Sequence, residues 1–187
     1  MIRRYDRPAQ PVDPYPEGPV RIAGFRYDSA LTLLRLRDAV KLRTGEDADY
    51  LTYHPYAVSW HAGDGVWRQI VVPSGLITDL TSVPGPLRWI VGRVGPWLEA
   101  AIVHDYLYIA WQDVPGREPR PEDKRFADAI MLAGMQEAGV RRWTARAIFW
   151  AISWFGGRTF AARNADRYVD ISDPAIRVQL MLRIPRD

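Results

Sequence analysis

The stretch from Gly95 to Gln112 reads GPWLEAAIVHDYLYIAWQ, and it decides how the rest of the chain must be arranged. Pro96 suits the first position of a helix, because it lacks the N–H that would be unpaired there and its φ is already helical. The residues that follow are apolar almost all the way round, which predicts a buried helix. His104 and Asp105 lie side by side in its middle. Because burial makes an unpaired charge or donor costly, each of these side chains must have a partner.

This buried His-Asp pair has two interpretations. It can be structural, satisfied by backbone carbonyls or by an arginine, which is a common device in protein cores. It can also be functional, with the imidazole as a general base and the carboxylate as a metal ligand or second acid. Neighbouring side chains on a helix point about 100° apart, so His104 and Asp105 must face different partners.

A second helix is predicted over residues 121–138. It begins with a proline and two acidic residues, which favour the positive end of the helix dipole, and a glycine follows its last residue. The short connection makes it antiparallel to the first helix, so that Asp128 and His104 can meet. The alternative is an intrahelical pair between Arg125 and Asp128, which contributes only about a few tenths of a kcal/mol.

A third helix is predicted over residues 143–155, with an aromatic stripe. Such a stripe is usually core or an oligomer contact, although a membrane-surface face has the same pattern. Residues 158–170 predict an irregular or helical continuation. Finally, apolar residues alternate with polar ones from Ile176 to Ile184, which predicts a half-buried closing strand that returns to the N-terminal sheet or pairs with a neighbouring subunit.

The N-terminal third carries strand signals instead. Residues 21–72 predict antiparallel strands, and the clearest hairpin consists of Tyr56–Trp60 and Val66–Val72 around the sequence HAGDG. Residues 1–20 hold five prolines and form an extended arm, which is either a disordered tail or a strap on a partner subunit. We therefore expect a single α+β domain over residues 21–187, with antiparallel strands, a helical hairpin plus third helix, and a closing C-terminal strand.

The loop from Pro73 to Pro86 is bounded by prolines and contains several polar residues. Asp79, beside Thr78, either caps a helix through backbone N–H groups or completes a site with the His-Asp pair. Ser82 lacks the G-x-S-x-G surroundings of a hydrolase nucleophile. Residues 86–94 then predict a short amphipathic helix or lid. The two other histidines, His54 and His61, lie in the strand region without close ligand spacing, which favours strand-end positions over metal ligands.

Three blocks of this sequence resemble a family of uncharacterised phage and prophage proteins. They are PSGLITDLTSVP at residues 73–84, HDYLY at His104–Tyr108, and the R-x-x-D signature at Arg125–Asp128. The family carries VPxGF-TDLxSVP, HDxLY and R-x-x-D blocks in the same order, and Leu76 stands here where that family tends to have Phe. The resemblance covers about residues 66–157, and it implies a phage setting without implying a reaction.

A second resemblance concerns the chemistry. The HDxxY helix, followed by a helix with another Asp, is similar to secreted phospholipases of the A-two type, especially the short prokaryotic ones. This similarity implies that His104 activates a water, Asp105 holds a divalent metal such as calcium, and Asp128 orients the imidazole; Tyr108 is the Tyr of the motif. The sequence departs from that pattern, since it has no cysteine for the disulfides of those enzymes and no clear glycine-rich calcium loop.

The composition excludes several classes of function. The 187 residues contain no cysteine, which removes disulfides, thiolate metal sites and cysteine nucleophiles. We expect no secretory signal, because no charged leader with a following apolar run stands at Met1, and no segment has the roughly 18 uninterrupted apolar residues that a membrane span needs. The net charge of +3 comes from scattered residues that are nearly all arginine, so nucleic-acid binding is not expected.

Two functional hypotheses follow. The first is a phage- or prophage-type hydrolase of host envelope material, either lipid ester or peptidoglycan, with His104 as base, Asp128 or Asp79 as its orienting carboxylate, and Asp105 as metal ligand or second carboxylate. The second is a non-catalytic virion, tail or assembly component, in which the arm and the C-terminal strand bind neighbouring subunits of a phage particle or homo-oligomer. Both hypotheses place the protein in the virion or in the host cytoplasm.

Overall fold

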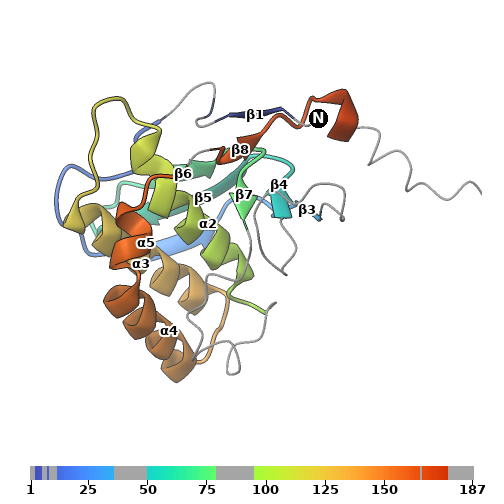
Figure 1. Cartoon of the computed structure of the whole chain (residues 1–187). Helices are drawn as coiled ribbons and strands as arrows, with labels where there is room; N and C mark the ends of the chain where they lie inside the picture. The colour runs from blue at the N-terminus through green and yellow to red at the C-terminus, as the bar shows by residue number, and fades with distance from the viewer. Residues whose placement is uncertain are drawn as a thin grey trace, which may run out of the picture.

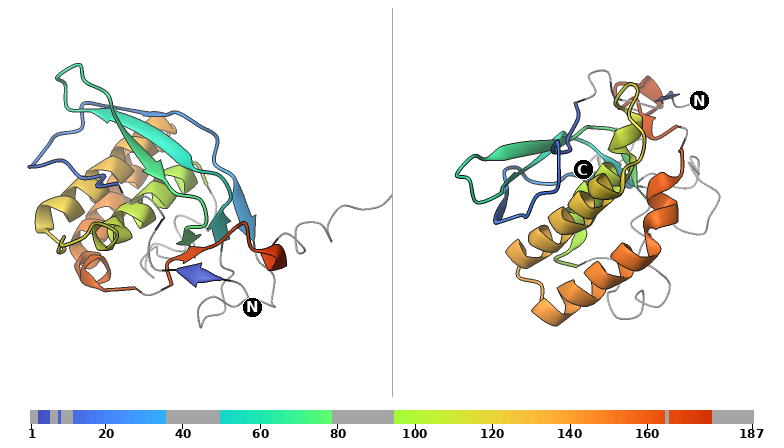
Figure 2. Two further views of the ribbon diagram at one scale, coloured as in Figure 1. Left: turned by 90° about the horizontal axis from the view of Figure 1, so that it is seen from above. Right: turned by 90° about the vertical axis from the view of Figure 1, so that its left-hand side faces the viewer.

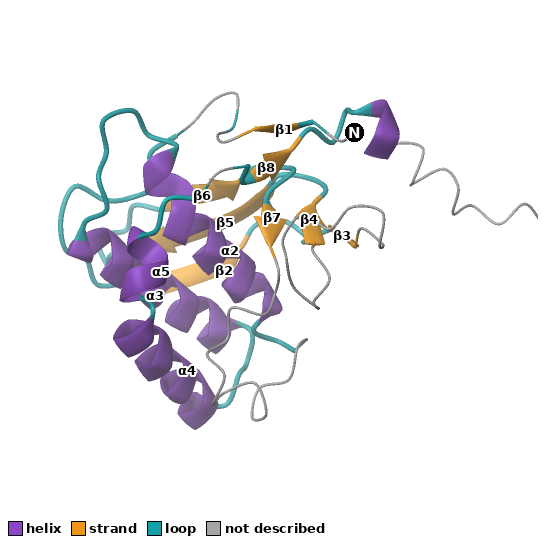
Figure 3. Cartoon of the chain, viewed as in Figure 1, coloured by secondary structure: helices purple, strands orange, loops and turns teal. Residues whose placement is uncertain are grey.

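The computed structural model describes residues 3–5, 8, 12–35, 50–78, 95–164 and 166–176. Within this part, antiparallel strands dominate the N-terminal portion, helices follow, and a short strand comes near the end. Figure 3 shows the strands and the helices gathered on different sides of the molecule. The predicted α+β class is confirmed.

All strands in the described part pair antiparallel. The sheet nearest the helices has the order β2 (Gly24–Tyr27), β5 (Tyr56–His61) and β6 (Arg68–Val72). The other ladders join β3 (Leu33–Arg35), β4 (Tyr50–Thr52) and β7 (Ile77–Thr78), and β1 (Arg4–Tyr5) with β8 (Tyr168–Val169). β5 and β6 form the predicted hairpin, with positive φ at Gly63 and Gly65 in its turn.

The helices fall where the sequence predicted them, with one shift at a helix start. They are α2 (Leu98–Ile109), continued by the 3-10 turn Ala110–Gln112, then α3 (Pro121–Glu137), α4 (Arg142–Phe155) and α5 (Gly157–Ala161). Helix α2 begins two residues after Pro96, which lies in the preceding turn instead of at the first helical position. The prediction for α3 is accurate at both ends, and Gly139, with a φ of 73°, follows its last turn.

Helices α2 and α3 form the middle layer of the molecule (Figures 1 and 2). One face of the pair packs on the β2-β5-β6 sheet, where Trp60, Val103 and Ile130 belong to one buried apolar cluster. A second cluster, which includes Met131 and Ile148, joins α2 and α3 to α4. The middle layer is therefore covered on both sides, which explains why α2 is apolar almost all round. No described helix has the length and apolar character needed to cross a membrane.

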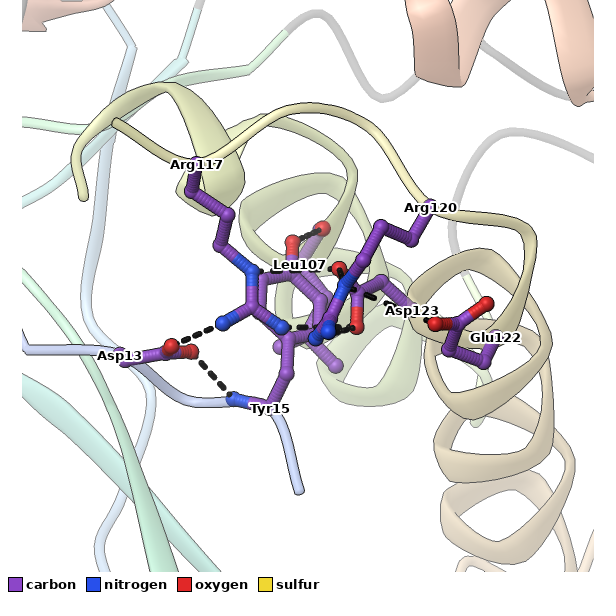
Figure 4. Close-up of polar contacts among 7 residues, drawn as sticks. All are labelled: Asp13, Tyr15, Leu107, Arg117, Arg120, Glu122 and Asp123. Carbon is purple, nitrogen blue, oxygen red and sulfur yellow. Dashed lines mark hydrogen bonds and ion pairs between the residues drawn. The ribbon is translucent and has the colours of Figure 1, made fainter. Parts of the chain in front are cut away.

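Part of the proline-rich arm packs on its own chain. Tyr15 is buried, and its hydroxyl donates to the carbonyl of Leu107 on α2. Asp13 pairs with Arg117, which also bonds Asp123 at the start of α3 through Nη2 at 2.8 Å (Figure 4). Around Tyr15 the arm thus lies against α2 and the start of α3 of its own chain. The domain boundary at residue 20 stays a prediction.

A C-terminal strand is present, and it lies before the segment in which the closing strand was predicted. β8 covers Tyr168–Val169 and pairs with the N-terminal β1, whereas Ile176 belongs to a helical turn and residues 177–184 lie outside the described residues. Oδ1 of Asp173 accepts the N–H of Ala175 at 2.8 Å, so it caps this turn, and a proline follows it at the first helical position. The alternating pattern concealed this capping signal, although the burial of Ile176 agrees with the pattern.

Candidate functional site

Helices α2 and α3 bring His104 against Asp128. Both side chains are buried, and Nε2 of His104 lies 3.1 Å from Oδ1 of Asp128. This is the contact that the antiparallel arrangement of the two helices allowed. Because a carboxylate only accepts, Nε2 carries the hydrogen and donates it. The imidazole is therefore fixed by a partner on a different helix.

Asp128 accepts three further hydrogen bonds. Tyr108, one turn beyond His104 on α2, donates its hydroxyl to Oδ1 at 2.8 Å. Lys124 and Ser153 reach the other oxygen, Oδ2, with Nζ at 2.6 Å and Oγ at 3.3 Å. The carboxylate is thus saturated by donors from α2, α3 and α4, so it has little freedom to turn away from the imidazole.

The surroundings of Asp128 keep it ionised. Burial raises the pKa of its carboxyl, but the hydrogen bonds from His104, Lys124 and Tyr108 and the charge of His104 outweigh burial, so that the pKa lies below its ordinary value. The pKa of the Tyr108 hydroxyl is raised, first by burial and then by the negative charge of Asp128. Tyr108 therefore stays a neutral donor to a permanently charged acceptor.

Lys124 and Ser153 are members of the site that the sequence analysis missed. Besides Asp128, Nζ of Lys124 bonds the carbonyls of Ile152 at 3.1 Å and Ser153 at 3.3 Å in the last turn of α4. Lys124 stands four residues before Asp128 on the same helix, and this spacing was readable from the sequence. Arg125, which was the alternative partner for Asp128, is exposed. For Ser153 no signal in the sequence pointed to Asp128.

Asp105 faces a different element, as the helical geometry requires. Its Oδ2 accepts the hydroxyl of Thr78 at 2.6 Å, and Thr78 is the buried last residue of β7. The two adjacent residues of α2 therefore look in different directions, with His104 toward α3 and Asp105 toward the end of β7. In the described part of the chain, no group of three or more acids or histidines is placed to hold a metal ion.

Other predicted site residues are not placed by the structure. Asp79 and Ser82 lie outside the described residues, as does the predicted helix or lid over residues 86–94. His54 is exposed, and His61 is the last residue of β5, where its Nδ1 accepts the N–H of Gly63 at 3.1 Å. His54 thus lies on the surface between β4 and β5, and His61 lies at a strand end.

The second ring nitrogen of His104 determines what the site can do. Among the described residues, none makes a hydrogen bond to Nδ1, and the side chain keeps 8% of its surface exposed. A histidine with one nitrogen held by an ionised carboxylate and the other available can take a proton from a water or hydroxyl, because the carboxylate stabilises the imidazolium that forms. The arrangement is chemically competent for general-base catalysis.

Comparison with known proteins gives relatives of undescribed function. A family model with the description "Protein of unknown function (DUF1353)" matches residues 52–152. The "Uncharacterized protein y4jT" of Sinorhizobium fredii (strain NBRC 101917 / NGR234) is 30% identical over 87 residues, which cover 46% of this chain and 23% of that protein. No solved structure matches. The residues matched by the family model include His104, Asp105 and Asp128.

Proposed function

Because the chain belongs to the DUF1353 family of proteins of unknown function, we propose an activity from its site alone: a hydrolase in which His104 is the general base. The observation that supports this most is the held imidazole, with Nε2 at 3.1 Å from a buried carboxylate and Nδ1 without a described partner. Asp128 is the orienting residue. Tyr108, Lys124 and Ser153 position Asp128 and do not meet the substrate.

The proposed reaction is the attack of water on an ester or amide carbonyl. Nδ1 of His104 takes a proton as the water oxygen bonds to the carbonyl carbon, which gives a tetrahedral intermediate. The intermediate collapses, the bond to the leaving alcohol or amine breaks, and the imidazolium returns its proton to that leaving group. Asp128 stabilises the imidazolium between these two steps.

The role of Asp105 is assigned only in part. A calcium ion takes roughly six to eight oxygen ligands, whereas the described residues offer the carboxylate of Asp105 and the hydroxyl of Thr78. These residues alone do not make a cation site. We propose Asp105 as the second carboxylate of the site, held toward the end of β7 by Thr78.

The proposed substrates are components of the host envelope, either lipid esters or peptidoglycan, in a phage or prophage setting. This setting is supported by the sequence resemblance of the three blocks, and the substrate class by the similarity of the HDxxY helix to phospholipases. The alternative, a virion or assembly component, relies on the arm and a C-terminal strand as subunit contacts. In this chain β1, within the arm, pairs with β8, and residues 177–184 of the expected strand lie outside the described residues.

The test is hydrolysis by the purified full chain. Substrates would be a soluble nitrophenyl ester, a dispersed phospholipid and peptidoglycan, each with wild type and with His104→Ala. We expect His104→Ala to lower the rate on the accepted substrate by about 10²- to 10⁴-fold, the usual contribution of a general base. His54→Ala, at an exposed histidine, is the matched control and should keep the wild-type rate. An equal rate in a folded His104→Ala protein would refute the proposal.

A further inference from the structure

Helix α4 presents an aromatic face outward. Its buried side, which includes Ala145, Ile148 and Ile152, packs on α2 and α3. On the opposite side Trp143, Trp150 and Trp154 are 60%, 53% and 71% exposed. The spacing of seven and then four residues places these three tryptophans along one stripe of the helix. Phe155, the last residue of α4, is 68% exposed beside Trp154. Figures 1 and 2 show α4 at the outside of the helical layer.

The same segment is strongly basic. Residues 141–158 contain four arginines and no Asp or Glu, although the whole chain has a net charge of only +3. These arginines are all exposed, and they are Arg141, Arg142, Arg146 and Arg158. Tryptophan rings with a polar N–H and arginines with long apolar stems both suit a boundary between apolar and aqueous surroundings.

We infer that this α4 face, defined by the three tryptophans, Phe155 and the four arginines, binds the surface of an anionic lipid bilayer. The basic residues attract anionic headgroups, while the indole rings enter the interface between headgroups and acyl chains. A second copy of the chain is a poorer occupant, because a two-fold contact through this face would set arginines against arginines. The charge of the face therefore selects an anionic surface.

The face adjoins the proposed site. Ser153, whose hydroxyl bonds Asp128, stands between Ile152 and Trp154 in the last turn of α4. Next to it, a Cβ on Gly156 would lie 2.4 Å from the hydroxyl of Tyr108, so this end of α4 touches the site directly. Docking of the face would hold the His104 site about one helix diameter from the bilayer surface. That consequence rests on the proposed function and favours lipid esters over peptidoglycan, whereas the binding itself does not depend on catalysis.

The experiment is sedimentation of the full chain with two kinds of vesicle, pure phosphatidylcholine and an equal mixture of phosphatidylcholine and phosphatidylglycerol. Wild type should bind the mixed vesicles and lose affinity as salt rises. The double variant Trp150→Ala/Trp154→Ala should bind them at least about tenfold more weakly, since two large apolar side chains no longer enter the interface. Trp67→Ala, at a 43% exposed tryptophan beside the β5-β6 hairpin turn, is the matched control and should bind as wild type.

Two further variants separate this inference from the proposed function. Arg142→Glu/Arg146→Glu should abolish the preference for the anionic vesicles, and His104→Ala should bind vesicles as well as wild type. Equal binding by the double tryptophan variant, or no vesicle binding by a wild type that hydrolyses the soluble ester, would overturn the inference and leave the hydrolase standing. A tryptophan-dependent dimer without vesicle binding would also overturn it. Vesicle binding without any hydrolysis would refute only the proposed function.

Discussion

Two buried carboxylates in this protein have similar partners and different consequences. Asp128 on α3 is bonded by Tyr108, Lys124 and His104. Asp113, which follows the 3-10 turn after α2, is bonded by the hydroxyl of Tyr168 and by Nη2 of Arg167 at 2.8 Å. Each aspartate thus has a tyrosine hydroxyl and a cation. Only Asp128 also holds an imidazole.

The two clusters differ in how far their donor side chains are exposed to solvent. The side chain of Arg167 is 5% exposed, and the pair ties the start of β8 to the end of the α2 segment. The side chain of Lys124 is 13% exposed, and that of His104 is 8% exposed. The Asp113 cluster is closed to solvent and serves to join two elements. The Asp128 cluster has a proton acceptor, the imidazole of His104, at its partly exposed edge, and can therefore take part in a reaction. A buried ion pair is therefore a sign of function only when one member has an unused, reachable atom.

The largest effect is expected from removing the sealed carboxylate. Asp113→Ala leaves the guanidinium of Arg167 buried without its counter-charge, although it keeps bonds to Gln112 and to the carbonyl of Asn164. The loss of one member of a buried pair costs about 3–5 kcal/mol of stability. Asp128→Ala should cost clearly less, because the side chain of Lys124 is 13% exposed and that of Arg167 is 5% exposed. Urea unfolding of both variants measures the difference. Equal losses would mean that the Asp128 cluster is as structural as the other.

A smaller effect on stability is expected from removing the hydroxyl of Tyr108 or of Tyr168, and only one of the two changes should affect the rate of hydrolysis. Tyr108→Phe and Tyr168→Phe each remove a hydroxyl that donates to a carboxylate, so each should lower the free energy of unfolding by about 1.5–3 kcal/mol. Only Tyr108→Phe should also slow hydrolysis, by severalfold, because Asp128 then holds His104 less firmly. Rates of the folded variants are compared with that of wild type. A Tyr168→Phe protein as slow as Tyr108→Phe would contradict the division of roles.

The smallest expected effect is on the stability of the folded protein at acidic pH. The pKa of Asp128 is lowered in the folded protein, so Asp128 contributes stability that is fully present above the unfolded value of about 4 and is lost as pH falls through the lowered folded value. Asp128→Asn should flatten this part of the curve of stability against pH. Urea midpoints measured from pH 5 downward test it, with the exposed Glu17 as control through Glu17→Gln. An unchanged slope in Asp128→Asn would mean that its carboxylate is not held ionised by the fold.

The sequence predicted the α+β class, the hairpin and the helices, because each has a local signal. The acidic first turn and the glycine delimit α3, and the apolar surround of α2 predicts a helix covered on both sides. The antiparallel connection then allowed the contact of His104 with Asp128. These features depend on neighbouring residues or on one short loop, so periodicity and capping suffice to read them.

The contacts that could not be predicted from the sequence depend on tertiary packing. Ser153 meets Asp128 because α4 crosses near it, and the docking of Tyr15 on α2 joins residues 92 positions apart. The helical turn at Ile176 was not predicted, because the alternation of apolar and polar residues indicated a strand there. The roles of Thr78 and Asp105 remain predictions, although their contact is present.

The central claim is that Nδ1 of His104 is reachable, and chemical modification tests it without any knowledge of the substrate. Diethyl pyrocarbonate acylates unprotonated imidazole nitrogens, and the chain has three histidines. Peptide mass spectrometry of the treated native protein should find His54 modified first and His104 modified more slowly, with any hydrolytic activity lost in step with His104. Modification of His54 and His61 with complete protection of His104 until the protein unfolds would contradict the claim and make the His104–Asp128 pair a structural one.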